Sequence, residues 1–196
     1  MPATSAIADS LRLHGVAEAQ DLFPMHLLQA LRQDALALHA AGRLREAATG
    51  RGTARQQTGL RGDSTLWLDD PQCGDAAADF LSALDGLRLQ LNRELLLGLH
   101  EVEAHYALYP AGAGYVRHRD RFHDDDARVL SLVCYLNPDW PDGAGGALRL
   151  HFPDGAHDMA PRLGTTVLFL SDEIEHEVLP ATQSRLSIAA WFRRRT

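Results

Sequence analysis

The sequence predicts an α+β protein with a jelly-roll, or double-stranded β-helix, core and N-terminal helices packed on one of its sheets. Apolar residues recur at helical spacing before about residue 100, and short β runs separated by turn residues follow. No Pro- or Ser-rich linker divides the chain. We therefore expect one domain over 1–196, with mostly helical support in 1–100 and the jelly-roll core in 101–196.

The helical part begins near Pro24, because the first turn of a helix tolerates proline. Leucines then recur at near-helical spacing, at Leu27, Leu28, Leu31 and Leu38. A second leucine-rich helical stretch covers about 75–97, with Asp85-Gly86 as a candidate break into two helices. Between them, 50–70 is rich in Gly, Thr, Arg and Gln, and we expect a mobile loop or hairpin there.

The β part consists of short runs bounded by turn residues. The expected strands are 102–109, 114–120, 128–136, 146–152, 164–170, 176–179 and 185–192. Turn residues between them are Pro110-Ala111-Gly112, Pro141-Asp142-Gly143 and Pro153-Asp154-Gly155. Seven or eight short strands at this spacing are typical of a double-sheet jelly roll.

Composition excludes several classes of function. The chain is 45% hydrophobic with a net charge of −7, so it lacks the basic surplus expected for binding a nucleic-acid backbone. It has no lysine, which excludes Schiff-base catalysis and a Walker-type phosphate lysine. Arg193-Arg194-Arg195 reads as a solvated end. Neither a signal peptide nor a membrane-spanning run is visible, and Cys73 and Cys134 form no disulfide framework, so we expect a soluble cytoplasmic protein.

His118 and Asp120 are candidate metal ligands. Residues two apart on an extended segment point the same way, so both side chains can reach one ion. A later histidine, His176, would complete a 2-His-1-carboxylate face with open positions, as non-haem Fe(II) oxygenases require. A second triplet, from His123 to Asp125, lies in a run of acids where ligand geometry would be poorly fixed, so we favour the first pair.

Arg185 strengthens this interpretation, because His176 alone could simply be a polar residue among acids. In a strand over 185–192, Arg185, Ser187, Ala189 and Trp191 share one face, and the apolar residues share the other. An arginine on the inner face of a barrel is a costly buried charge unless an anion meets it. A dicarboxylic acid chelating the iron would be that anion.

Several further segments occur in a characteristic order along 60–196. They are Arg61-Gly62-Asp63, Trp67, Tyr109-Pro110, Gly114 to Asp120, Tyr135-Leu136-Asn137, Asp139-Trp140, Gly145 to Arg149, His176, Arg185 and Trp191. With these segments the sequence resembles the prolyl 4-hydroxylase branch of the Fe(II)/2-oxoglutarate-dependent oxygenases. The likeness is greatest to the hypoxia-inducible-factor prolyl hydroxylases and their bacterial relatives.

The resemblance implies roles for individual residues. His118, Asp120 and His176 would bind Fe(II), and a 2-oxoglutarate pocket would be formed by Arg185, Tyr135, Tyr109 and Leu148. Substrate contacts would come from Trp191, Arg61, Asp63, Trp67 and Arg128. An Asp63–Arg128 ion pair would close the mobile loop over a bound peptide; the alternative is an incidental surface salt bridge. O2 would be the second co-substrate, with ascorbate as a supporting reductant.

The implied activity is hydroxylation at C4 of a prolyl residue in a protein, with release of succinate and CO2. For the bacterial relatives, a translation GTPase such as elongation factor Tu is a plausible substrate. The chain stops at Thr196, where the animal enzymes continue, so no substrate preference is carried over. The alternatives are a hydroxylase of a small molecule or free amino acid, and a sensor of iron, 2-oxoglutarate or oxygen without turnover. The segment 61–67 favours a polypeptide substrate.

Overall fold

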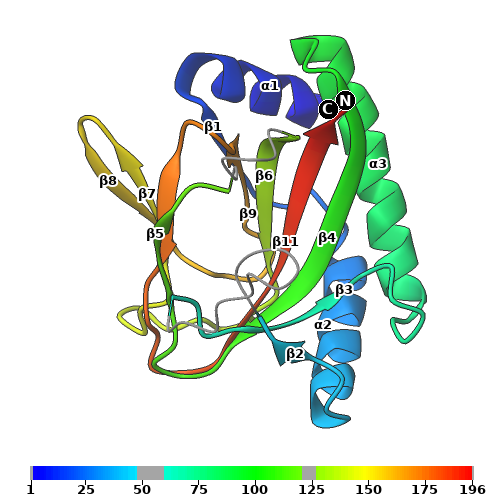
Figure 1. Cartoon of the computed structure of the whole chain (residues 1–196), viewed down its shortest axis with the longest axis vertical. Coiled ribbons are helices and arrows are strands. Elements are labelled where there is room, and N and C mark those ends of the chain that lie inside the picture. Colours follow the sequence, from blue (N-terminus) through cyan, green and yellow to red (C-terminus); the bar gives the residue numbers. More distant parts are fainter. Residues whose placement is uncertain (1, 48–59, 121–126, 196) are drawn as a thin grey trace.

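In the part of the chain that the structure describes, two antiparallel sheets face one another, and three helices cover the outer side of the larger sheet (Figure 1). The computed structural model describes residues 2–47, 60–120 and 127–195. The triplet from His123 to Asp125 and residues 50–59 of the expected loop lie outside this part. The helices are α1 (Pro2–His14), α2 (Met25–Ala40) and α3 (Asp75–Leu95).

The larger sheet has the strand order β1-β9-β6-β11-β4-β3-β2, and the smaller has β5-β10-β7-β8. The larger sheet contains β1 (Val16–Ala19), β2 (Arg45–Glu46), β3 (Ser64–Trp67), β4 (Leu99–Tyr109), β6 (Arg128–Tyr135), β9 (Thr166–Leu170) and β11 (Arg185–Arg194). The smaller contains β5 (Tyr115–His118), β7 (Leu148–Phe152), β8 (Gly155–Met159) and β10 (Glu175–Val178). Every pairing is antiparallel.

Strand β11 alternates as the sequence predicts. Its residues Leu186, Ile188, Ala190 and Phe192 are buried in one apolar cluster with the helices. The other face of the same sheet joins a second cluster that includes Tyr109, Tyr135, Leu148, Phe169 and Val178. Because those residues come from both sheets, this second cluster fills the space between them. Arg185 therefore projects toward the smaller sheet.

Two helical features differ from the prediction. Helix α3 runs unbroken through Asp85-Gly86. Gly86 lies on its exposed side, with nothing near the position of a Cβ atom, while Leu84 and Leu87 on either side are buried. Their burial outweighs the cost of a mid-helix glycine, about 1 kcal/mol. Helix α1 was not predicted as a separate element.

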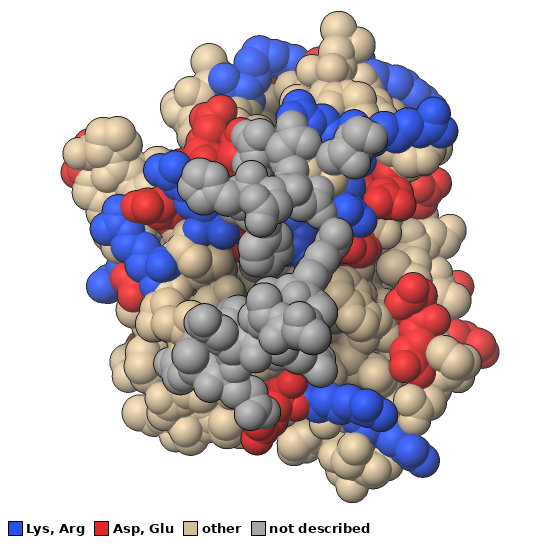
Figure 2. Space-filling view, viewed as in Figure 1, with Lys and Arg blue, Asp and Glu red and all other residues tan. Residues whose placement is uncertain are grey.

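Short strands at or next to the sheet edges are the other departure. β1, β2, β3 and β8 are absent from the seven predicted runs, and β3 lies inside the expected loop. β8 pairs with β7 through the predicted turn of Pro153-Asp154-Gly155, yet nearly all of it is exposed, so it carries no apolar alternation. None of the described helices is long and apolar enough to cross a bilayer. On the face in Figure 2, acidic and basic side chains are interspersed.

Candidate metal centre

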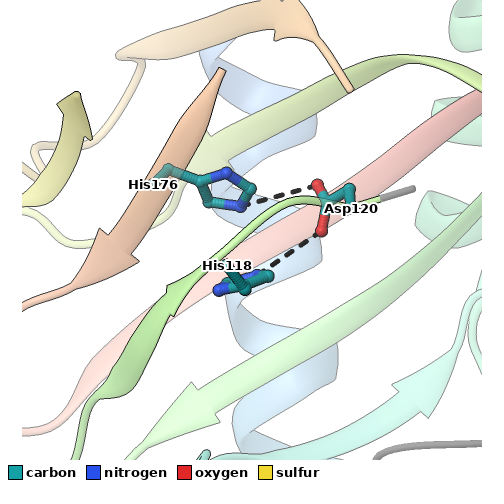
Figure 3. Close-up of side chains that lie close together, drawn as sticks. All are labelled: His118, Asp120 and His176. Carbon is teal, nitrogen blue, oxygen red and sulfur yellow. Dashed lines mark ion pairs between the residues drawn. The ribbon is translucent and has the colours of Figure 1, made fainter. Parts of the chain in front are cut away.

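His118, Asp120 and His176 converge on one point between the two sheets (Figure 3). His118 ends β5 and pairs with His176 of β10. The Nε2 atom of His118 lies 3.5 Å from Oδ1 of Asp120, and that of His176 lies 3.6 Å from Oδ2. One ligand atom from each side chain lies within 4.8 Å of the others. A single ion can therefore take all three.

Backbone carbonyl groups orient both imidazole rings. Nδ1 of His118 lies 2.7 Å from the oxygen of Val116, and Nδ1 of His176 lies 3.2 Å from that of Ile174. A carbonyl oxygen only accepts hydrogen bonds, so Nδ1 carries the proton in each ring. In each ring the lone pair therefore lies on Nε2, which faces Asp120. This tautomer, protonated at Nδ1, is the one that a metal requires.

The charges of the group also favour a cation. Burial raises the pKa of Asp120, but His176, His118 and a hydrogen bond from Ser131 together hold that pKa well below its usual range. Burial lowers the pKa of His176. At neutral pH the centre thus offers a carboxylate and a neutral His176, the protonation states in which these side chains bind metals.

Arg185 forms a second buried polar site on the opposing sheet. Its side chain is 3% exposed, and its guanidinium carbon lies 4.5 Å from the ring centroid of Tyr109 and 5.5 Å from that of Tyr135. One guanidinium nitrogen donates to the carbonyl oxygen of Gly146 over 3.3 Å. Among the described residues, no carboxylate pairs with this cation.

Two donors beside one another await an acceptor. Nε of Arg185 and the hydroxyl of Tyr135 are buried without a hydrogen-bond partner in the described structure. Burial raises the pKa of Tyr135 to about 12, so its hydroxyl keeps its proton. Unpaired buried donors are costly, and a ligand carboxylate would satisfy both of them. The donor set therefore fits an acid that reaches from the metal centre to the larger sheet.

Comparison with known proteins agrees with this chemistry. Residues 104–193 match the family model for the 2OG-Fe(II) oxygenase superfamily. Human prolyl hydroxylase EGLN3 is 33% identical over 167 residues, which cover 79% of this chain and 68% of that protein.

The chain belongs to the 2OG-Fe(II) oxygenase superfamily.

Further relatives place this oxygenase in the prolyl hydroxylase branch. The crystal structure of a Pseudomonas putida prolyl-4-hydroxylase is 44% identical, with a TM-score of 0.88, over 98% of this chain and 100% of that one. A Trichoplax adhaerens prolyl hydroxylase, solved with a hypoxia-inducible-factor peptide fragment, is 26% identical with a TM-score of 0.85, over 97% and 88%. Human Egl nine homolog 1 is 28% identical over 95% of this chain, which spans 45% of that protein. The chain thus spans about half the length of the first curated relatives it matches.

Membership of this superfamily implies Fe(II), 2-oxoglutarate and O2 as the reacting partners. The three candidate ligand residues come from the smaller sheet and the segment after β5, whereas Arg185 comes from the larger sheet. Tyr109, Tyr135 and Leu148, the other residues predicted for the 2-oxoglutarate pocket, share the cluster between the sheets. Arg185, Tyr109 and Tyr135 therefore lie on the larger sheet and face the two predicted histidine ligands on the smaller sheet, which also carries Leu148.

Three of the predicted substrate residues also lie together. Trp67, which is 43% exposed, and Trp191 each have a ring centroid 5.2 Å from that of His105, which lies between them. The Arg128 guanidinium lies 3.8 Å above the Trp191 ring. These four side chains form a continuous aromatic and cationic group on the inner face of β3, β4, β6 and β11.

The predicted Asp63–Arg128 pair is not the pairing in this structure. Arg61 donates to both carboxylate oxygens of Asp63, over 2.7 and 2.6 Å. Arg128 donates to Glu103 over 2.8 Å. Arg61 and Asp63 are two apart on an extended segment, so their side chains share a side and meet locally. Glu103 lies on the inner face of β4, which is separated from β6 by β11 alone, and its carboxylate is within reach of the Arg128 side chain.

Sequence reasoning missed three buried polar residues of this site: Ser131, Ser171 and His105. Ser131 donates to Asp120 over 2.6 Å, and its oxygen lies 2.9 Å from that of Ser171. A single serine on a strand, or just after one, carries no distinctive pattern, so no sequence signal marked these two. His105 could have been noticed, because it shares the β4 face of Ala107 and Tyr109.

His105 predicts a pH dependence of stability. Burial lowers its pKa to about 4, aided by Arg61 and Arg128 and opposed by Asp63. An unfolded histidine titrates near about 6.5. The unfolded state therefore binds more protons between these values, so the unfolding free energy falls as the pH drops from about 6.5 towards 4, by at most about 1.4 kcal/mol per pH unit for this group.

We expect His105→Gln to flatten that slope. Denaturant unfolding of both metal-free proteins across the same pH range would measure it. The lowered pKa of His176 acts in the same direction in both proteins, so the difference between them isolates His105. Equal slopes would show that His105 does not titrate in this window.

Proposed function

We propose that this oxygenase hydroxylates C4 of a prolyl residue in a protein, consuming 2-oxoglutarate and O2 and releasing succinate and CO2. One observation carries the proposal: a His118–Asp120–His176 centre faces a buried Arg185 that has no carboxylate partner among the described residues. The likeness to prolyl hydroxylases over almost the whole chain supports the choice of substrate class. We further propose that the two sheets form the predicted double-stranded β-helix and that the chain acts as one domain.

Each residue contributes binding, orientation or shielding. His118, Asp120 and His176 would hold Fe(II) on one face, which leaves positions open for the co-substrates. The bound metal, with 2-oxoglutarate and O2, supplies the oxidising power. Arg185 would pair with the distal carboxylate, and the Tyr135 hydroxyl would donate to the same group.

Apolar neighbours complete the proposed pocket. Tyr109 covers one side of the Arg185 guanidinium, and Leu148, 1% exposed, lies in the same cluster. Such walls exclude water, which strengthens the pairing between Arg185 and an anion. Ascorbate would serve as a supporting reductant that is not bound by any identified residue.

The group of Trp67, His105, Trp191 and Arg128 favours a polypeptide over a small molecule. Trp67 presents a large exposed ring, and exposed aromatic side chains are enriched where proteins bind partners. Acidic and basic side chains are interspersed on the face in Figure 2, so a nucleic-acid backbone would meet carboxylates there. Free Cys73 and Cys134 suit the proposed cytoplasmic location.

The decisive experiment follows Fe(II)-dependent succinate formation from 2-oxoglutarate, with and without clarified cell lysate or purified elongation factor Tu. We expect succinate formation to increase when the lysate or elongation factor Tu is present. Peptide mapping of the substrate protein should then find one added oxygen atom on a proline. Stimulation by free proline or other metabolites instead would favour the small-molecule hydroxylase. Tight binding of metal and 2-oxoglutarate without any stimulated turnover would favour the sensor.

A further inference from the structure

A chain of two buried serines leads to the carboxylate of Asp120. Ser131 lies on β6 of the larger sheet, and Ser171 is the first residue after β9 of the same sheet, opposite the strands that carry the histidines. Ser131 is 1% exposed and Ser171 is fully buried. The backbone N–H of Ser171 donates to the carbonyl oxygen of Val129, which fixes Ser171 beside β6.

The hydrogen-bond direction along this chain is determined by chemistry. Oδ2 of Asp120 is a carboxylate oxygen, which accepts the hydrogen bond from the Ser131 hydroxyl group. Ser131 has one proton and gives it to that oxygen over 2.6 Å. The contact of 2.9 Å between the two hydroxyl groups must therefore be donated by Ser171. The order is Ser171 to Ser131 to Asp120.

This order constrains how Asp120 can meet a metal. Oδ2 accepts from Ser131, whereas Oδ1 accepts no hydrogen bond from a described residue other than its 3.5 Å contact with Nε2 of His118. A carboxylate that is fixed at one oxygen cannot rotate to place both oxygens symmetrically on an ion. Oδ1 is thus the freer ligand atom, and single-oxygen binding leaves one more coordination position open.

We propose that Ser131 and Ser171 are positioning residues that hold Asp120 for single-oxygen binding of the metal. The inference rests on the proposed function, since it assigns Asp120 as a ligand. Removal of a hydrogen bond to a metal ligand typically lowers the metal affinity by about 10- to 100-fold. The hydroxyl pair is not needed for folding stability to a comparable degree. Replacing both partners of a buried hydrogen bond by apolar groups often leaves the free energy of unfolding nearly unchanged.

The test is a titration of the metal-free protein with Co(II), monitored by visible absorption. We expect Ser131→Ala to weaken Co(II) binding about 10- to 100-fold and to change the shape of the Co(II) spectrum. Ser171→Ala should weaken binding less, because Ser131 still donates. Ser131→Thr retains the hydroxyl and should restore affinity to within a few-fold of the wild type.

Thr166→Val is the matched control. Thr166 is also a fully buried hydroxyl residue of the larger sheet, but its side chain donates to the carbonyl oxygen of Gly164. Its removal should leave the Co(II) affinity and spectrum unchanged, and thermal unfolding without metal shows whether each variant folds. If Ser131→Ala does not fold, Ser171→Ala decides the question alone.

The outcomes separate the two proposals. Wild-type affinity and spectrum in Ser131→Ala, or in Ser171→Ala where that variant decides, would overturn the positioning role and leave the proposed function intact. Failure of the wild-type protein to bind Co(II) or Fe(II) at all would overturn both. Equal weakening by Thr166→Val would show that any lost buried hydroxyl disturbs the centre, which also overturns the inference.

Discussion

Replacement of Arg185 by alanine is expected to raise the 2-oxoglutarate concentration needed for half-maximal turnover by roughly 30-fold or more. Loss of one partner from a buried charge pair costs about 2–5 kcal/mol, and each 1.4 kcal/mol is about tenfold in affinity. The effect should be large because Arg185 is almost fully buried and no described carboxylate shares it. Succinate formation across a 2-oxoglutarate titration would measure it.

Two controls sharpen this result. Arg185→Lys keeps the charge without the planar fork and should fall between the alanine variant and the wild type. Arg149→Ala removes an arginine that is paired with Asp158 on the smaller sheet and should leave the requirement unchanged. Without ligand, Arg185→Ala should unfold no more easily than the wild type, since it removes an unpaired buried charge. Normal turnover at low 2-oxoglutarate would refute the assignment.

Replacement of Asp120 by alanine is expected to reduce Fe(II)-dependent succinate formation to background. Asp120 is the one anionic member of the three-residue centre, so its loss leaves two neutral donors for a divalent cation. Metal titration monitored by calorimetry should show that metal binding is lost or weakened by at least about 100-fold. That is the upper end of the loss in affinity seen when only a hydrogen-bond partner of a metal ligand is removed. Asp120→Asn, which preserves the shape, should fail similarly because the charge is gone.

Asp158→Ala provides the comparison, because Asp158 is an exposed aspartate that pairs with Arg149. It should bind metal and produce succinate like the wild type. Addition of excess Fe(II) should rescue Asp120→Asn only partly, if at all. Full activity of either Asp120 variant at ordinary Fe(II) concentrations would remove Asp120 from the ligand set.

The sequence allowed the main strands and the central residues to be predicted because both have local signatures. Alternation along 185–192 determines which face of β11 meets the helices, and the spacing of His118 and Asp120 places both side chains on one side. The short edge strands could not be predicted in this way. β8 is stabilised by its pairing with β7, a contact that its own residues do not reveal.

Tertiary pairing explains what else was missed. Asp63 pairs with Arg61 in this structure, whereas the predicted Asp63–Arg128 pair belongs to a loop closed over a bound peptide. The Ser131–Ser171 contact joins residues 40 positions apart, one on β6 and one just after the neighbouring strand β9, so neither serine stands out by itself. Gly86 shows the converse: a local signal for a break is overridden by burial of the leucines around it.

The two proposed binding groups for 2-oxoglutarate lie on opposite sheets, so a bound molecule would link the sheets. A molecule held by the metal at one end and by Arg185 at the other would connect the two sheets and restrict their motion relative to one another. Amide hydrogen exchange should then slow in both β10 and β11 when the ligand binds, although only one end touches each. The distance between the metal centre and Arg185 would also select for ligand length, so keto acids shorter or longer than 2-oxoglutarate would bind poorly.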